Sequence, residues 1–147
     1  MTNLIQIVTA FIAAISYSMI FGARGKRLLI AGIGSALTWA LYLVVFHFTS
    51  NDFNSVLAAT LFGSFFSAIA ANRLQIPKTV FLFSVLIALI PGRYLYLTML
   101  AVVESDAAAF TDYGIQTLTI SFAIALGIII MLVCMQIKNS IQQSRKR

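Results

Sequence analysis

Apolar stretches long enough to cross a membrane alternate along the chain with short polar segments. They cover residues 4–21, 28–46, 55–71, 79–103 and 113–137. A helix that crosses a bilayer needs about 20 apolar residues. The pattern therefore predicts an all-α membrane protein in which five helices form one transmembrane domain over residues 1–147. The first stretch has no basic segment before it and no small-residue cleavage site before Phe21, so we interpret it as a retained span.

Composition strengthens this interpretation. Hydrophobic residues make up 61% of the chain, and the mean hydropathy is +0.97. Only 10% of the residues are charged, against about 25% in ordinary soluble domains. This composition predicts a multi-pass membrane protein with little mass outside the membrane. The single cysteine, Cys134, excludes a disulfide within the chain and a cysteine-rich metal site.

The charged residues predict how the chain is oriented. Basic residues cluster in the segments 22–27 and 72–78 and at the C-terminal end from Lys138 onward. The segments 47–54 and 104–112 hold the acidic residues and contain no Lys or Arg. Because cytoplasmic loops are enriched in Lys and Arg, we expect the N-terminus outside and the C-terminus in the cytoplasm.

The net charge of +6 does not indicate nucleic-acid binding, because the basic residues lie in short clusters at the ends of spans. The terminal cluster 145–147 either contacts anionic lipid or only sets the orientation of the last helix.

The fourth apolar stretch is interrupted at Pro91-Gly92, and Arg93 follows directly. In a straight helix Arg93 would lie about 22 Å from Lys78 and about 16 Å from Glu104, too deep for its side chain to reach the cytoplasmic face. Because basic and acidic segments must lie on alternate sides of the membrane, the fourth apolar stretch has to cross it. A re-entrant hairpin is the alternative, but it would leave the basic segments on opposite sides.

A broken helix with a cation at the break is a common way to build a binding site within a transporter. The half-helix after Pro91 would present free N–H groups and a partial positive charge, and Arg93 would add a guanidinium. The helix start and the guanidinium would both favour the binding of a carboxylate. Tyr94 and Tyr96 follow Arg93 in the sequence and would orient or gate this carboxylate. Alternatively, Arg93 pairs with a carboxylate or carbonyl of a partner helix and only holds an assembly together.

Small residues at helical spacing indicate close helix packing. They are Gly32 and Ala36 in the second span, and Ala59, Gly63 and Ser67 in the third. These faces pack either within this chain or against another subunit. Thr38, Thr60 and Ser64 are candidates for hydrogen bonds between helices or for the lining of a path, and the sequence leaves both open.

Several kinds of chemistry are missing from the sequence. No Asp or Glu lies inside a span, which argues against the four-helix small multidrug exporters. We find no Ser/His/Asp or Cys/His set, no metal-ligand cluster and no phosphate-binding glycine loop. We therefore expect neither an enzyme nor a cofactor.

Two motifs in the fourth stretch resemble a known family. They are Ile76-Pro-Lys-Thr-Val-Phe81, and Ile90-Pro91-Gly92 followed by residues 94–99. Together with the segment 17–22 and its basic turn, and with Gly32-Ile-Gly-Ser-Ala36, they are similar to the small membrane subunit of the bacterial threonine/serine exporter family. The resemblance covers about residues 12–104.

This resemblance implies a protein of the bacterial cytoplasmic (inner) membrane that exports small metabolites. They are threonine and serine in some members and dicarboxylates such as succinate in others. It also implies a larger membrane subunit as partner, and a site at Pro91, Gly92 and Tyr96, with Pro77 starting the helix. Arg93 departs from the small or apolar residue expected after Pro-Gly, which favours a more acidic substrate. A structural subunit without substrate contacts, and a channel made of several copies of this chain, remain the alternatives.

Overall fold

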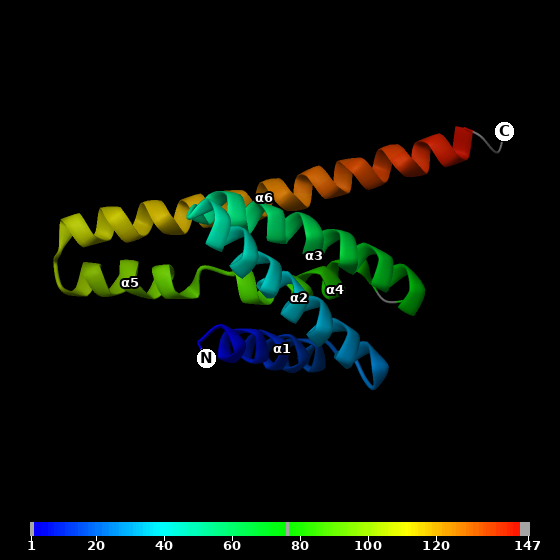
Figure 1. Ribbon diagram of the computed structural model, residues 1–147, viewed down its shortest axis with the longest axis horizontal. Coiled ribbons are helices and arrows are strands. Elements are labelled where there is room, and N and C mark those ends of the chain that lie inside the picture. The colour runs from blue at the N-terminus through cyan, green and yellow to red at the C-terminus, as the bar shows by residue number, and fades with distance from the viewer. Residues whose placement is uncertain (1, 76, 145–147) are drawn as a thin grey trace.

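The computed structural model describes residues 2–75 and 77–144, which form helices joined by short turns (Figure 1). The elements are α1 (Thr2–Ile20), α2 (Lys26–Thr49), α3 (Asp52–Leu74), α4 (Lys78–Leu86), the 3-10 helix η1 (Ile87–Leu89), α5 (Gly92–Val103) and α6 (Ala107–Ser144). Four helices are long and apolar enough to cross a membrane. The segments 78–89 and 92–103 add a fifth span, bent by 62°. The prediction of an all-α membrane protein with a broken fourth span is confirmed.

The helix ends follow from local sequence. Asp106 caps α6, because its carboxylate accepts hydrogen bonds from the backbone N–H groups of Ala108 and Ala109 at 3.1 and 3.0 Å. This cap starts α6 six residues before the predicted span at 113, in a stretch that contains no helix breaker. The turn between α1 and α2 needs glycine, since Gly22 and Gly25 have φ values of +77° and +61°.

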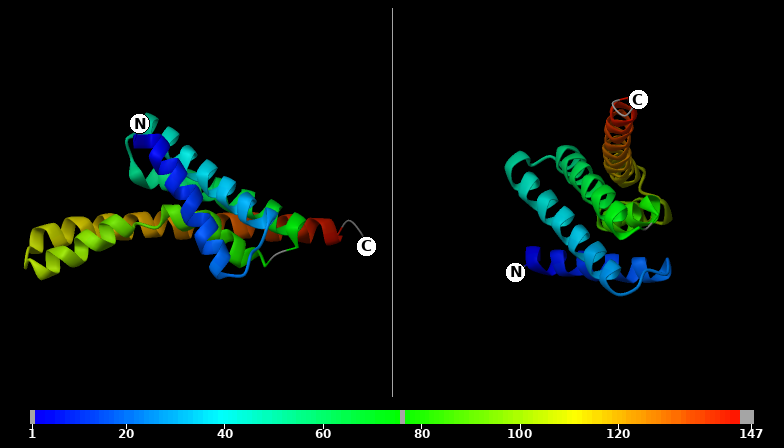
Figure 2. Two further views of the ribbon diagram at one scale, coloured as in Figure 1. Left: turned by 90° about the horizontal axis from the view of Figure 1, so that it is seen from below. Right: turned by 90° about the vertical axis from the view of Figure 1, so that its right-hand side faces the viewer.

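Helices α1, α2 and α3 pack side by side, and α4 lies against them (Figure 2). Glycines allow the close approaches. A Cβ on Gly32 would lie 2.7 Å from the Phe11 ring of α1, and a Cβ on Gly63 would lie 2.7 Å from Leu86 of α4. The other small residues singled out in the sequence are on α2 and α3: Ala59 and Ser67 are buried, and Ala36 is half-buried. The contacts of these two glycines are therefore within the chain.

Helix α5 and the first part of α6 form an antiparallel hairpin that extends beyond α1, α2 and α3 (Figure 1). The hydroxyls of Thr98 and Thr117 lie 3.5 Å apart inside it, and Ala101 is buried. The outer surface is apolar and includes Met99 and Leu118. A surface of this kind suits a lipid or protein environment, in agreement with a membrane location.

The turn 21–25, the end of α3 and the start of α4 lie toward the same end of the molecule as the end of α6 (Figure 2). The N-terminus and the turn between α2 and α3 lie toward the opposite end. The basic segments 22–27 and 72–78 are thus together, as the charge pattern requires. Which end faces the cytoplasm stays a prediction, and the basic cluster at 145–147 lies outside the described residues.

Candidate substrate cavity at the helix break

The break between η1 and α5 is an inverse γ-turn centred on Pro91. Pro91 has φ −76° and ψ 53°, close to the ideal values of this turn. The N–H of Gly92 donates to the carbonyl of Ile90 at 2.7 Å, and the first helical bond of α5 runs from the Leu95 N–H to the Pro91 carbonyl at 3.0 Å. No side chain of residues 3–75 and 77–137 caps this end. The N–H groups of Arg93 and Tyr94 are therefore open to a ligand.

A cavity of about 530 Å³, which we call the break cavity, lies at this turn. Its volume is within the about 300–1,000 Å³ typical of small-molecule sites. Pro91, Gly92, Arg93 and Tyr94 line it, as do Ala88, Leu89 and Ile90 on the other side of the turn. Tyr96 does not line it: this side chain is 65% exposed on the outside of α5. The structure thus brings four of the five predicted site residues together and leaves Tyr96 apart.

The other walls come from the ends of α1 and α2. Asn3 and Gln6 contribute from α1, and Trp39, Tyr42 and His47 from α2. The indole N–H of Trp39 donates to Gln6 Oε1 at 3.4 Å, and the Tyr42 hydroxyl donates to Asp52 Oδ1 at 2.8 Å.

Sequence reasoning missed these polar walls because they come from helices distant along the chain. A usable signal was the spacing of Trp39, Tyr42 and Phe46 on one helix face, where neighbouring ring centroids lie 4.9 and 5.8 Å apart. Gln6, a polar residue in an otherwise apolar first span, was a second signal.

The break lies beside the first two turns of α1 and the last turn of α2, because Asn3 and His47 share its cavity. From there α5 continues past the ends of α1 and α2, after a bend of 62° (Figure 1). The depth of Arg93 in the membrane stays a prediction. Arg93 is exposed at this cavity, so its guanidinium is accessible from outside the bundle.

The break cavity can bind an anion and a cation on different walls. The start of α5 supplies two free N–H groups, and Arg93 supplies a guanidinium that fits a carboxylate. On the α2 side, the Tyr42 hydroxyl lines the cavity and donates a hydrogen bond to the carboxylate of Asp52, which lies behind it. Within residues 2–75 and 77–144 no group of three or more His, Cys, Asp or Glu is placed to hold a metal ion.

An apolar helical bundle with a polar cavity at a broken helix is the architecture of a membrane transporter. A family model described as "Threonine/Serine exporter, ThrE" matches residues 6–134. The chain belongs to this family, and it is a multi-pass membrane protein of the exporter type. Neither a curated protein nor a solved structure matches it.

Proposed function

We propose that this chain carries the substrate site of a secondary exporter that moves small carboxylate-bearing metabolites out of the cytoplasm. The candidate substrates are threonine and serine, or dicarboxylates such as succinate. The proposed location is the bacterial cytoplasmic membrane, with the N-terminus outside, and the proposed partner is a larger membrane subunit. The observation that carries the proposal is the break cavity, where Arg93 and the free N–H groups of α5 meet.

The substrate carboxylate binds between the Arg93 guanidinium and the N–H groups of Arg93 and Tyr94. The partial positive charge at the start of α5 adds to the attraction. A hydrogen bond to a charged group contributes about 1.5–3 kcal/mol. The same arrangement removes the unfavourable contact between the Arg93 side chain and the positive end of the helix, so binding stabilises the break.

The opposite wall favours an amino acid over a dicarboxylate. An ammonium group there would lie near the Tyr42 hydroxyl and Gln6 Oε1, both of which can accept hydrogen bonds. Asp52 does not line the cavity, but its carboxylate accepts a hydrogen bond from Tyr42, which does, and from there it would attract the ammonium and repel a second carboxylate. We therefore place threonine and serine ahead of succinate. This revises the preference for a more acidic substrate that Arg93 alone suggests.

The test is an export assay of Arg93→Ala with the partner subunit co-expressed. The loss of one charge-assisted contact predicts that export per molecule of protein falls by about 10- to 100-fold. Arg73→Ala is the matched control, because Arg73 is exposed at the end of α3 and does not line this cavity. Arg93→Lys keeps the charge but not the bidentate geometry, so it retains part of the activity.

Unchanged export by Arg93→Ala at normal protein levels would contradict the proposal. If the substitution instead lowers the amount of assembled complex while each complex exports normally, Arg93 holds an assembly together and the chain is a structural subunit. A homo-oligomeric channel would show ohmic conductance from the purified chain alone.

A further inference from the structure

A smaller cavity, of about 250 Å³, adjoins the break cavity, and we call it the side chamber. The two cavities share Gln6, Trp39 and Ala88, so they are neighbours around these three side chains. The rest of the side chamber is lined by α1, through Thr9, Ala10 and Ala13. Because Asn3 lines only the break cavity, the side chamber continues along α1 away from its N-terminus, over about 10 Å from Gln6 to Ala13.

Small residues on one face of α1 leave this space open. The four residues of α1 in its lining have the spacing i, i+3, i+4 and i+7, which places them on one side of a helix. This side of α1 packs against η1, which contributes Ala88 to the same lining. Alanine side chains have no atoms beyond Cβ to fill the gap between the two elements. The side chamber therefore depends on alanine at positions 10, 13 and 88.

A hydrogen-bonded pair stands where the two cavities meet. The indole N–H of Trp39 donates to Gln6 Oε1 at 3.4 Å, and the amide N–H groups of Gln6 can then donate to a ligand. Thr9 lies one turn further along α1 and is exposed. Its hydroxyl donates to the carbonyl of Ile5 at 2.7 Å, so its oxygen can still accept. A ligand hydroxyl both donates and accepts, and it therefore matches this pair of groups.

The proposed pose of an amino acid brings its side chain to the side chamber. The carboxylate lies at Arg93, and the ammonium lies near Tyr42 and Gln6. The side chain is attached to the same carbon as the ammonium. It is therefore within reach of Gln6, the residue at which the side chamber begins.

We propose that the side chamber receives the side chain of the transported amino acid and selects among side chains. Ala88 sets the width of the entrance, while Gln6 and Thr9 bind a side-chain hydroxyl. The inference rests on the proposed function, because the carboxylate and the ammonium must bind in the break cavity. It adds the class of amino acid that is selected there, namely one with a short side chain that carries a hydroxyl.

A lipid chain is the competing occupant, because Thr9 and Ala13 are exposed and the side chamber has an open side. An acyl chain would leave the hydrogen-bonding groups of Gln6 and Thr9 unused, whereas a hydroxyl would use both. The solute is therefore favoured. Access of water to position 9 separates the two occupants.

The first test is the ratio of threonine to serine export, measured in the same cells with the partner subunit co-expressed. Ala88→Leu narrows the entrance. Because threonine is larger than serine by one methyl group, threonine export is expected to fall about tenfold relative to serine export. Ala70→Leu is the matched control, since Ala70 is also half-buried, packs against another cluster and lines neither cavity. Should Ala88→Leu fail to fold, Ala13→Leu narrows the side chamber from an exposed position.

A second ratio tests the binding of the hydroxyl. Valine has the shape of threonine without the hydroxyl, and Thr9→Val makes the same change in the protein. The loss of one neutral hydrogen bond predicts that Thr9→Val lowers threonine export about fivefold relative to valine export. Thr9 lines only the side chamber, so the carboxylate site is untouched.

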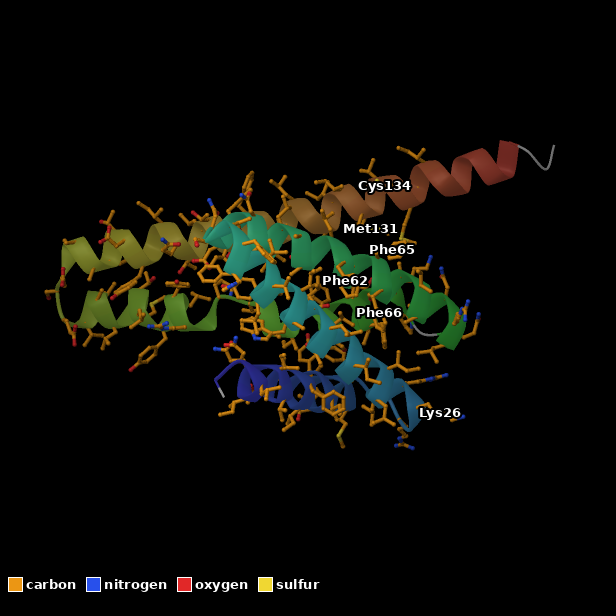
Figure 3. All side chains as sticks on the ribbon, in the orientation of Figure 1. Lys26, Phe62, Phe65, Phe66, Met131 and Cys134 are labelled. Carbon is orange, nitrogen blue, oxygen red and sulfur yellow. The ribbon has the colours of Figure 1, made fainter. Side chains whose placement is uncertain are left out.

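The labelling test uses the full chain in phosphatidylcholine nanodiscs, with any subunit that co-purifies. Thr9→Cys in a Cys134→Ser background places the only thiol of this chain in the side chamber, since Cys134 is on α6, away from α1 (Figure 3). Threonine at about ten times its Kd is expected to slow alkylation by a small water-soluble reagent about tenfold. Glycine at about ten times its own Kd is expected to leave the rate unchanged, because it has no side chain. Both Kd values come from the fluorescence of Trp39, the only tryptophan.

The outcomes separate this inference from the proposed function. Protection of position 9 by threonine but not by glycine, with both export ratios lowered, supports the side chamber. Equal or absent protection, or an export ratio that stays unchanged in a folded variant, overturns the inference and leaves the site at Arg93 standing. If neither amino acid changes the Trp39 fluorescence and Arg93→Ala exports normally, the proposed function fails and the inference fails with it. A thiol at position 9 that reacts only with a lipid-soluble maleimide identifies a lipid crevice and also overturns the inference.

Discussion

Helices α3 and α6 approach each other closely at Gly127, and replacing this glycine by alanine tests the packing directly. A Cβ on Gly127 would lie 2.8 Å from both Cβ and Cγ2 of Thr60, and 3.5 Å from the carbonyl oxygen of Leu57. Carbon atoms pack at about 3.5–4.0 Å. The two helices would have to separate by roughly 0.7 Å at this point, since the Thr60 Cβ is fixed to the backbone of α3.

The expected change in the free energy of unfolding follows from two opposing effects. Overpacking of this kind costs about 1–3 kcal/mol, while alanine in place of glycine favours a helix by about 1 kcal/mol. Gly114→Ala in the same helix is the matched control, because its Cβ would meet only Thr98 Cγ2 at 3.9 Å, an ordinary contact. We expect Gly114→Ala to be neutral or stabilising, and Gly127→Ala to be less stable than it by about 1–3 kcal/mol.

The assay is reversible unfolding of the purified protein in mixed micelles, followed by the fluorescence of Trp39 and by helical circular dichroism. Both variants are compared with the wild type in the same micelles, so that the difference between them isolates the contact with Thr60. Equal changes in the free energy of unfolding for the two variants would refute the close approach of α3 and α6 at Gly127.

Two further substitutions test the break cavity. Gly92→Ala is expected to keep the free energy of unfolding within about 1 kcal/mol of the wild type, because no atom lies within 4 Å of the added Cβ; a larger loss in the unfolding assay would show that the break is more closely packed than this. Asp52→Asn keeps an acceptor for Tyr42 but removes the charge, so serine export is expected to fall about tenfold relative to succinate export. An unaltered ratio of the two rates would mean that Asp52 does not act on the substrate.

The sequence predicts the features that depend on local signals. Length and hydropathy locate the spans, and Pro91-Gly92 locates the break because proline cannot continue the hydrogen bonding of a helix. The structure agrees on both. The extra length of α6 was missed, because residues 107–112 are too polar to count toward a span and yet contain nothing that stops a helix.

The cavity walls depend on contacts between distant segments and could be predicted only in part. The residues around Pro91 were found because they are consecutive in the chain. Gln6 and Tyr42 were missed because no local pattern brings α1 and α2 to the break. The buried serines Ser64 and Ser67 could be recognised as small, but not as hydroxyls without partners, since that property depends on which helices surround them.

Helix α6 is one unbroken helix of 38 residues. Ile120 of this helix lines the break cavity, and Gly127 lies about 10 Å further along the axis, at the close approach to Thr60 of α3. Because a helix without a break is stiff along its length, a displacement at Gly127 is transmitted to Ile120. The fit of α6 on α3 therefore sets the width of the break cavity at the wall that Ile120 forms.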